Sequence, residues 1–333
     1  MIKKDQIHLM NKLLIFVVLI LVSFNTYAAQ LTPEMTSFAH RVAKNGRISE
    51  RAVLKWLKRA NKTEDVIKLM DRQAEAKPWK DYKPHFIYDR KIKKGVAFAK
   101  RYPKTLKKAK RIYGVDPSVI VAILGVETDF GTYALSHRAM DALFTLAFYY
   151  PRRAEFFKNE LDALMVYAYR NKLDPFNLKS SYAGAVGMPQ FMPSNILKFG
   201  KEFSGDGRIN IFKSGADSIG SIANYLSKHG WKRGEPLAVK VRTKGTAWKK
   251  YLKQGWRPKY TVAQMKRNGV RPSMWVNPKR KGSLVELNGD KGTEYWIIFN
   301  NFYVVTKYNP SIKYSMAVTI LAKHLELKST NLR

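Results

Sequence analysis

The stretch that decides the fold is DPSVIVAILGVETDFG, residues 116–131. Asp116 followed by Pro117 is a strong helix start, because Asp favours the capping position and Pro is best tolerated at the first helical position. The residues that follow are apolar on all sides, which predicts a helix that lies in the core. Glu127 stands near the end of this predicted helix.

Glu127 is the residue of this stretch best suited to acid catalysis. The apolar side chains expected around its carboxyl group are those of Ile123, Leu124, Val126 and Phe130. A carboxyl group removed from water favours its protonated form, so it can act as a general acid near neutral pH. The alternative is a Glu at a helix end that forms an ion pair with one of the many Lys residues.

Asp129 does not fit as a second catalytic carboxylate. Residues two apart on a helix point to opposite faces, whereas the carboxyl groups of a retaining glycosidase lie about 5 to 5.5 Å apart in one cleft. We therefore expect Asp129 to be solvated or to cap the helix. Residues 180–194 contain no acid either, so a glycosidase-like site here would have one acid.

Helices are expected on both sides of the core helix. Apolar residues recurring every three to four positions predict two short amphipathic helices within 36–70 and single helices over 91–113, 138–149, 153–170, 216–228 and 311–328. Small residues, Gly and Pro crowd the segment 174–194, which predicts a loop or broken helix. Alternating runs predict strands at 237–243, 282–288 and 294–309.

The composition is that of a folded protein without cysteine chemistry. Of 333 residues, 45% are hydrophobic, which excludes disorder because enough apolar surface offsets the chain entropy lost on folding. The length predicts two or three structural units. Cysteine is absent, which excludes disulfides, thiolate nucleophiles, Cys-ligated zinc and a lipid on an N-terminal cysteine. The six His residues lack HxxxH and HExxH spacings, and no GxxxxGK[ST] or GxSxG motif occurs.

The N-terminal segment has the three-part layout of a secretory signal peptide. Three Lys residues precede an apolar run over 13–22 and a polar stretch that reaches Ala28. Ten apolar residues are too few to span about 30 Å of hydrocarbon. We expect residues 1–28 to be a signal peptide that is cleaved after Ala28. The alternative is a retained membrane anchor.

The chain is strongly basic. Its formal net charge is +36, and removal of residues 1–28, with three Lys and one Asp, leaves 36 − 2 = +34. Such a charge raises the local concentration of polyanions. Nucleic acid is the default partner inside a cell, but export argues against it. The expected partners are anionic lipid head groups, acidic surface glycans and the carboxylate-bearing peptides of peptidoglycan, and the alternative is a solvated lysine-rich surface.

One segment resembles the calcium loop of an EF-hand. Glu202, Ser204, Asp206 and Arg208 fall on positions 1, 3, 5 and 7 of that pattern, with Gly at the sharp turn. Position 12, which needs a bidentate Glu, is a Lys, and Asp217 four residues later would close an enlarged loop. Calcium binding is one interpretation, and a polar turn is the other.

Several longer motifs follow one another along the chain. They are Gly125-Val126-Glu127-Thr128 with Gly131, Tyr150-Pro151-Arg152-Arg153-Ala154-Glu155-Phe156-Phe157, Ala183-Gly184-Ala185-Val186-Gly187, Gln190-Phe191-Met192-Pro193-Ser194, Phe203-Ser204-Gly205-Asp206-Gly207, Asn224-Tyr225, His229-Gly230-Trp231, Asn301-Phe302-Tyr303 and Tyr308-Asn309 with Tyr314. In this order they resemble the lytic transglycosylase B family, peptidoglycan-cleaving enzymes of Gram-negative envelopes. The resemblance covers roughly residues 80–325.

The resemblance implies an α+β fold that is mainly helical, with a lysozyme-like catalytic core. We expect a helical N-terminal region over 29–113, the core over 114–235, a small strand-containing region over 236–287, and strands and a helix returning to the core over 288–333. The resemblance also implies a periplasmic protein. Because it lacks the lipidated cysteine that some family members carry, it should be soluble or peripherally attached to the membrane.

The resemblance also implies the site residues. Glu127 would be the single catalytic acid/base. The sugar-binding cleft would be lined by Ser181, Gln190, Tyr225, Tyr308, Asn309 and Tyr314, with Tyr82, Arg152 and Arg153 near the substrate. The tyrosines have the alternative of core packing, and the Arg pair that of a solvated helix start. A calcium ion would be structural, since the chemistry requires no cofactor, and Glu202 stands where the family has Asp.

The implied reaction is cleavage of the β-1,4 bond between N-acetylmuramic acid and N-acetylglucosamine, with formation of a 1,6-anhydro ring. Two other functions stay open, a hydrolytic muramidase and a non-catalytic peptidoglycan-binding protein. The expected partners are peptidoglycan glycan strands and other cell-wall enzymes, without nucleic acid.

Overall fold

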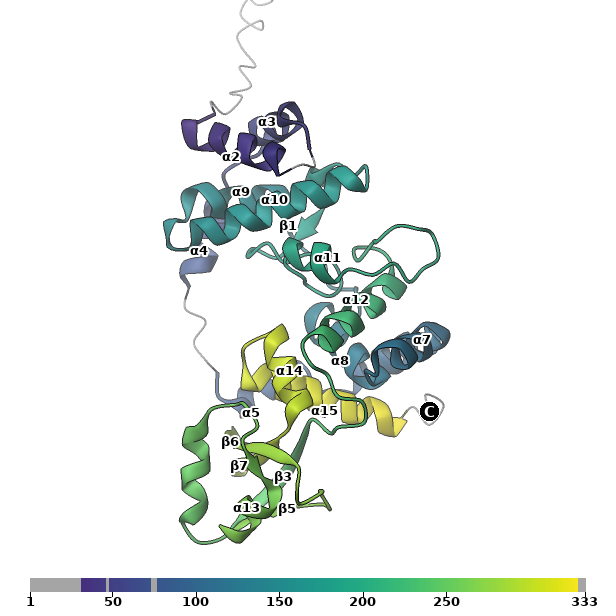
Figure 1. Ribbon diagram of the computed structural model, residues 1–333, viewed down its shortest axis with the longest axis vertical. Coiled ribbons are helices and arrows are strands. Elements are labelled where there is room, and N and C mark those ends of the chain that lie inside the picture. The colour runs from purple at the N-terminus through teal and green to yellow at the C-terminus, as the bar shows by residue number, and fades with distance from the viewer. Residues whose placement is uncertain (1–30, 46–47, 73–76, 329–333) are drawn as a thin grey trace, which may run out of the picture. The chain divides into compact units, whose positions relative to one another are not determined.

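The computed structural model describes residues 31–45, 48–72 and 77–328. The chain divides into two compact units, Met1–Ala60 and Asn61–Arg333. Helices dominate the described residues, and the second unit also contains a small antiparallel sheet (Figure 1). The predicted α+β class with mainly helical content is confirmed.

The described part of the first unit is a pair of helices, α2 (Pro33–Lys44) and α3 (Glu50–Arg59). Thr32 and Ser49 cap them, since each hydroxyl oxygen accepts a hydrogen bond from a backbone N–H three residues on. Leu57 is fully buried on the apolar face of α3. The three-to-four spacing that predicts this helix therefore marks its packed face.

The region 36–70 contains three helices where two were predicted. The third is α4 (Glu64–Asp71), at the start of the second unit. Ala60 and Thr63 have extended backbone conformations, which end α3 and separate it from α4.

The single helix predicted over 91–113 is also divided. It consists of α6 (Asp89–Arg101) and α7 (Pro103–Tyr113). Pro103 has no N–H to continue a helix and disfavours a helical residue before it. Tyr102 accordingly has φ −123° and ψ 41°.

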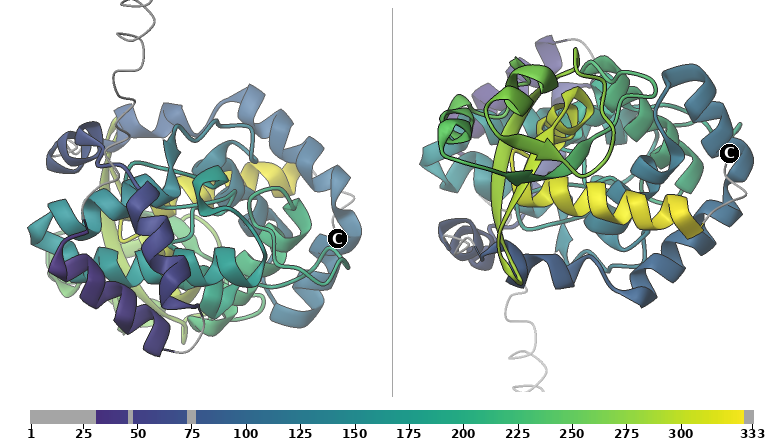
Figure 2. Two further views of the ribbon diagram at one scale, coloured as in Figure 1. Left: turned by 90° about the horizontal axis from the view of Figure 1, so that it is seen from above. Right: turned by 90° about the horizontal axis from the view of Figure 1, so that it is seen from below.

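The core of the second unit forms around α8 (Pro117–Thr128), in which every residue from 119 to 125 is buried, as predicted. Asp116 occupies the N-cap position, but its side chain makes no capping hydrogen bond there. The helix start is thus confirmed, whereas the capping role of the side chain is wrong. Helix α15 (Ile312–Lys328) packs against α8, and Figure 2 shows it in yellow, running away from the sheet.

The other helices build the wall around this core. They are α5 (Trp79–Tyr82), α9 (Ala139–Tyr149), α10 (Ala154–Arg170), α11 (Pro193–Phe199), α12 (Gly215–Lys228) and α14 (Asn300–Tyr308). Those predicted over 138–149, 153–170 and 216–228 are confirmed, each with its start shifted by one residue. The short α11 ends the segment predicted as a loop or broken helix.

The sheet has the strand order β4-β6-β7-β3-β5, with every pairing antiparallel. Its strands are β3 (Ala238–Thr243), β4 (Tyr260–Thr261), β5 (Val270–Pro272), β6 (Lys281–Gly289) and β7 (Gly292–Ile298). The strands predicted at 237–243 and 282–288 are confirmed as β3 and β6. The boundary expected after residue 287 falls inside β6, because β6 pairs with β7 to the end of one hairpin. Helix α13 (Val262–Arg267) follows β4.

The strand predicted over 294–309 is wrong in its second half, where α14 forms. Phe299 is the last residue joined to the sheet, through its N–H, which donates to the carbonyl of Leu237 at 2.8 Å. On α14, Phe302 and Val305 are buried three residues apart. A short apolar run of this kind fits one helical face as well as it fits a strand.

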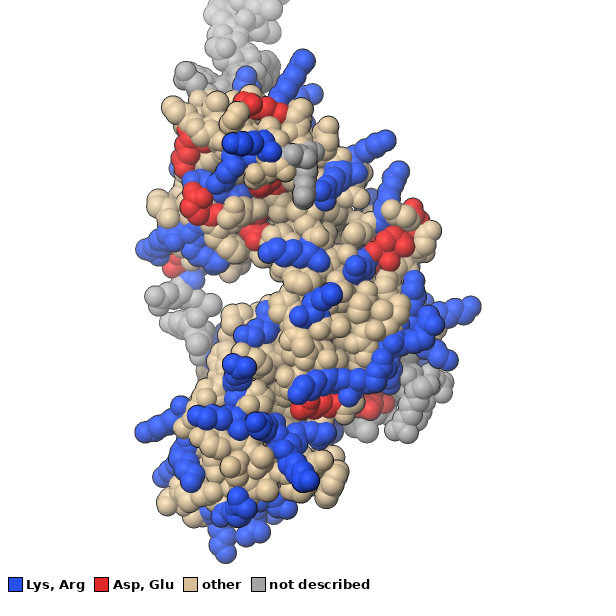
Figure 3. All heavy atoms as spheres, viewed as in Figure 1, with Lys and Arg blue, Asp and Glu red and all other residues tan. Residues whose placement is uncertain are grey.

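Basic side chains are spread widely over the face shown in Figure 3. Within the described residues, no helix combines the length and apolar character needed to cross a membrane. The predicted signal peptide, residues 1–28, lies outside the described part of the chain.

Candidate active site

Glu127 lies in the last turn of α8, which ends in an unusual turn. Asp129 has φ 49° and Phe130 φ 65°, so two successive non-glycine residues adopt the left-handed region, at a cost of about 1 to 2 kcal/mol each. The Phe130 ring folds back over α8, where a Cβ on Gly125 would lie 2.6 Å from its Cζ atom. Glycine is therefore required at position 125, one turn before the candidate acid.

A buried ammonium group holds this end of α8 in place. Lys91 on α6 is 5% exposed, and its Nζ donates to the carbonyl of Gly125 at 2.8 Å. The same Nζ lies 3.2 Å from Asp129 Oδ1, and Lys94 donates to the other oxygen of Asp129. Since Gly125 and Asp129 flank Glu127, this contact fixes the chain on both sides of the acid.

The position of Asp129 confirms that it is no second catalytic acid. Burial alone would raise its pKa, but the hydrogen bonds from Lys94 and Lys91 outweigh burial and hold the pKa below its ordinary value. Asp129 is therefore an ionised C-cap residue, paired with cations instead of Glu127.

Glu127 itself is partly buried. Removal from water raises the pKa of its carboxyl group to about 7, although a hydrogen bond from Tyr314 opposes the rise. The Tyr314 hydroxyl donates to Glu127 Oε1 at 2.6 Å. Both protonation states are thus accessible near neutral pH, as a group that must give and then take a proton requires.

Tyrosines surround this carboxyl group, where apolar side chains were predicted. Burial and the charge of Glu127 together raise the pKa values of Tyr82, Tyr308 and Tyr314, so all three lie within its electrostatic reach. The rings of Tyr308 and Tyr314 are stacked, with centroids 6.5 Å apart and planes 8° apart. Tyr225 packs edge-on against Tyr308 at 5.0 Å. The sequence places these tyrosines on four different elements, so only the fold brings them together.

The small-residue segment is a loop that lies against both α8 and α14. The hydroxyl of Thr128 donates to the carbonyl of Met188 at 2.8 Å, and the hydroxyl of Tyr308 donates to that of Pro189. Gln190 has φ 50°, and its side-chain amide donates to Gly187 O at 3.0 Å. The loop backbone therefore holds Gln190 beside the tyrosine cluster.

Ser181 lies at the start of the same loop. Its hydroxyl oxygen accepts a hydrogen bond from Ala185 N–H at 3.2 Å. The preceding strand β2 (Lys179–Ser180) pairs with β1 (His137–Arg138), which anchors the loop to the start of α9. A hollow opens between α10 and α14 in the view of Figure 3.

Three of the predicted residues make other contacts. The Arg152 guanidinium pairs with Asp71 at 3.2 Å, and that of Arg153 lies 4.3 Å from the centre of the Phe156 ring. Asn309 directly follows Tyr308, and its carbonyl accepts a hydrogen bond from Ser311 N–H at 2.7 Å. Their predicted roles near the substrate stay predictions.

The predicted calcium loop is organised by one buried carboxylate. Asp217 is fully buried, and its two oxygens accept hydrogen bonds from the backbone N–H groups of Phe203, Ser204 and Asn210 at 2.8 to 2.9 Å. Glu202 accepts hydrogen bonds from Ser204 and Gly205 inside the turn, and Asp206 accepts one from the Arg208 N–H.

This arrangement does not fit the expected metal site. No group of three or more His, Cys, Asp or Glu side chains in the described residues could hold a metal ion. Asp217 therefore acts in this structure as the acceptor for the loop backbone, and calcium binding by Glu202, Ser204, Asp206, Arg208 and Asp217 stays a prediction.

The contact between Lys91, Lys94 and Asp129 was not predicted from the sequence. The three-residue spacing of the two lysines on one helix is the signal that it leaves. In a chain with 61 Lys and Arg residues, that spacing does not distinguish a buried lysine from a solvated one.

Comparisons with known proteins agree with this geometry. The sequence profile described as "Transglycosylase SLT domain" matches residues 30–323. The chain belongs to this family. It is 37% identical over 305 residues to the membrane-bound lytic murein transglycosylase B of Escherichia coli (strain K12), covering 89% of this chain and 83% of that protein.

Solved structures of the family have the same fold. The soluble lytic transglycosylase SltB1 from Pseudomonas aeruginosa matches with a TM-score of 0.84 at 37% identity, over 89% of this chain and 99% of that one. The Escherichia coli lytic transglycosylase Slt35 in complex with calcium matches with a TM-score of 0.81 at 37% identity, over 89% of this chain and 93% of that one. The resemblance inferred from the motifs and the predicted fold class are both confirmed.

Proposed function

We propose that the chain is a peptidoglycan lytic transglycosylase that cleaves the β-1,4 bond between N-acetylmuramic acid and N-acetylglucosamine. The observation that carries the proposal is Glu127, an acid with a pKa of about 7 and no second carboxylate free to assist it. Family membership, and a relative named as a lytic murein transglycosylase, supply the substrate class.

In the first step, protonated Glu127 donates its proton to the glycosidic oxygen, and the bond from that oxygen to C1 of muramic acid breaks. The acetamido group of the substrate stabilises the positive charge that develops at C1. Tyr314 stabilises the carboxylate left behind, because its hydroxyl already donates to Oε1.

In the second step, the Glu127 carboxylate accepts the proton of the muramic acid 6-hydroxyl. The hydroxyl oxygen attacks C1 and closes the 1,6-anhydro ring, which restores the protonated acid. A tethered hydroxyl gains up to about 7 to 11 kcal/mol over a free nucleophile through proximity. One carboxyl group therefore serves both steps, and Asp129, paired with Lys91 and Lys94, has no part in them.

The chemistry proposed here requires no cofactor, since Glu127 moves both protons and the substrate brings its own nucleophile. A hydrolytic muramidase would use the same acid with water as nucleophile and would differ in its product. A non-catalytic binding protein would leave the cost of removing Glu127 from water without a use.

The proposed cleft lies along α14 and the loop that contains Ser181 and Gln190. Tyr225 and Tyr308 use their hydroxyls to bond backbone carbonyls of Lys307 and Pro189, so they would meet sugars with their ring faces. The full proposed lining is Tyr82, Ser181, Gln190, Tyr225, Tyr308, Asn309 and Tyr314, with Arg152 and Arg153 further along the glycan strand.

Calcium is proposed only as a structural ion, and no step of the reaction depends on it. Slt35 of Escherichia coli is known in complex with calcium. In this chain, Asp217 would have to exchange its amide contacts for an ion, and Glu202 replaces the Asp of the family pattern.

We also propose a periplasmic location, with the chain exported by its signal peptide. Support comes from the layout of residues 1–28 and the peptidoglycan substrate. Other cell-wall enzymes and anionic envelope surfaces are proposed partners, the latter because the charge is strongly positive.

The substitution Glu127→Gln tests the proposal. It keeps the size and most hydrogen bonds of the side chain but can neither donate nor accept the proton, so turnover of peptidoglycan should fall by at least about two orders of magnitude. The matched control is Glu286→Gln, an exposed position on β6, which should retain full activity. Asp129→Asn should lose far less than Glu127→Gln. Equal losses at positions 127 and 129, or an active Glu127→Gln, would refute the assignment.

A further inference from the structure

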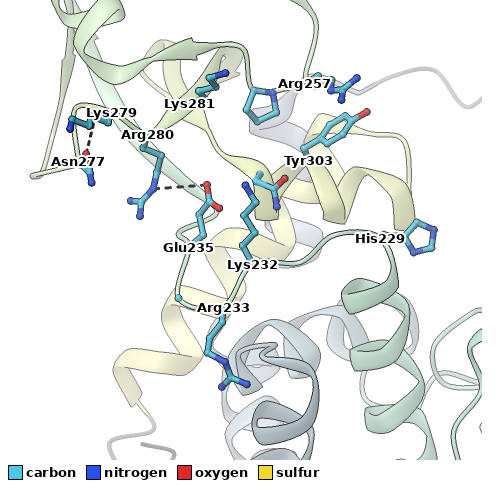
Figure 4. Close-up of a pocket in the computed structure, with 13 residues that line it drawn as sticks. His229, Lys232, Arg233, Glu235, Arg257, Asn277, Lys279, Arg280, Lys281 and Tyr303 are labelled. Carbon is cyan, nitrogen blue, oxygen red and sulfur yellow. Dashed lines mark hydrogen bonds and ion pairs between the residues drawn. The ribbon is translucent and has the colours of Figure 1, made fainter.

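A basic cavity lies at the end of α12, and its lining includes none of the residues around Glu127 (Figure 4). Its volume is about 890 Å³. The lining comes from the segment after α12, the segment before β4 and the turn that leads into β6. Its cationic residues are Lys232, Arg233, Arg257, Lys279, Arg280 and Lys281, against the single acid Glu235.

Few of these positive charges are neutralised. Arg280 Nε lies 3.9 Å from Glu235 Oε1, and the Arg233 guanidinium donates to the carbonyl of Arg111 at 3.0 Å. Within the described part of the chain, no carboxylate forms an ion pair with Lys232, Arg257, Lys279 or Lys281. Like charges around a concave surface repel one another and concentrate anions in the space between them.

The cavity continues along α14 into a second hollow of about 400 Å³. Arg257 and Tyr303 line both spaces. The second hollow adds Lys307 and Trp256, whose large ring is exposed. The combined surface offers cations together with aromatic rings, which suits an anionic organic group better than a bare ion.

Two helices connect this cavity with the candidate active site. At the end of α12, the ring of His229 lines the cavity and stacks on that of Tyr225, with centroids 4.0 Å apart and planes 25° apart. Helix α14 carries both Tyr303, which lines the cavity, and Tyr308, which faces the charge of Glu127. The cavity is therefore built on the same two helices as the aromatic wall of the site, which points to another part of the same substrate.

We propose that this cavity binds the carboxylate groups of the peptide stems of peptidoglycan. The inference rests on the proposed function, which makes peptidoglycan the substrate. Peptide stems carry free carboxylates, for which Arg and Lys side chains form charge-assisted hydrogen bonds. The volume lies within the roughly 300 to 1,000 Å³ of small-ligand sites, and a concave site fits a short peptide better than the plane of a lipid bilayer.

The direct test is calorimetric titration of the mature chain with the free stem L-Ala-γ-D-Glu-meso-diaminopimelate-D-Ala. Binding should weaken as salt is raised and should be lost for the same peptide with its carboxylates converted to amides. The double substitution Lys279→Gln/Lys281→Gln should weaken binding at least tenfold. The matched control is Lys249→Gln/Lys266→Gln, which removes two exposed charges from the same unit outside the cavity.

The inference is contradicted if the amidated peptide binds equally well or if the two double variants bind alike. A second measurement compares cleavage of glycan strands with and without peptide stems. Lys279→Gln/Lys281→Gln should raise KM for strands with stems and leave KM for bare strands unchanged. Equal effects on both strands would overturn the inference while the proposed function stood. Failure of the unaltered chain to cleave either strand would refute the proposed function, and the titration alone would then decide the role of the cavity.

Discussion

The raised pKa of Glu127 has a thermodynamic consequence that does not depend on turnover. The folded state holds the Glu127 proton up to a pH of about 7, whereas the unfolded chain releases it near its ordinary pKa of 4.5. Between these values the folded state binds more protons than the unfolded state, so the free energy of unfolding falls as pH rises. This contribution to stability is fully present below pH 4.5 and is lost by the time the pH has passed about 7.

Glu127→Gln removes this pH dependence, because Gln does not titrate. At about 1.4 kcal/mol per pH unit, the interval from 4.5 to about 7 corresponds to about 3 kcal/mol. The variant should therefore gain about 3 kcal/mol in free energy of unfolding relative to the unaltered chain between pH 4 and pH 8, while losing its activity. A catalytic acid removed from water would thus reduce the stability of the enzyme at neutral pH.

Urea unfolding of both chains at a series of pH values between 4 and 8 measures this difference. Glu286→Gln, on the exposed side of β6, should stay parallel to the unaltered chain throughout. If the difference between Glu127→Gln and the unaltered chain were the same at every pH, the carboxyl group would not be desolvated as the structure indicates. A difference that grew towards acid pH would contradict the reasoning in sign.

Two further substitutions test the surroundings of the acid and the loop. Tyr314→Phe removes the hydrogen bond to Glu127 Oε1 that lowers its pKa, so the alkaline limb of the pH profile of kcat/KM should move up by about one pH unit; an unmoved or lowered limb would contradict this role. Asp217→Asn turns one of its two acceptor oxygens into a donor facing a backbone N–H, so the free energy of unfolding should fall by about 2 to 3 kcal/mol, with or without a calcium chelator. If chelator alone removed the same stability from the unaltered chain, a bound cation would be holding the loop.

Much of the fold is predictable because the decisive helix has a strong local signal. An apolar run after Asp-Pro fixes α8 and its place in the core, and the last helix is found from the same periodicity. The failures have local causes too. Pro103 divides one predicted helix, and the run that ends at Tyr308 fits a helical face as well as strand alternation, so only its loss of sheet partners after Phe299 decides its structure.

The candidate site was predicted in part. Glu127 is identifiable from its helix, but its surroundings are not, because Tyr314 is 187 residues away in the sequence and donates its hydrogen bond only through the packing of α15 on α8. The left-handed turn at Asp129 and Phe130 leaves no sequence signal, since neither residue is Gly. The contact of Lys91 with both flanks of Glu127 likewise depends on the tertiary packing of α6.

The most direct test of the central claim is the chemical form of the product. Purified peptidoglycan digested by the mature chain should release muropeptides that end in 1,6-anhydromuramic acid, each lighter by one water than its hydrolytic counterpart and without a new reducing end. Mass spectrometry with and without borohydride reduction distinguishes the two, and Glu127→Gln should release neither. Predominantly reducing products would contradict the account and would identify the protein as a hydrolytic muramidase that uses the same acid.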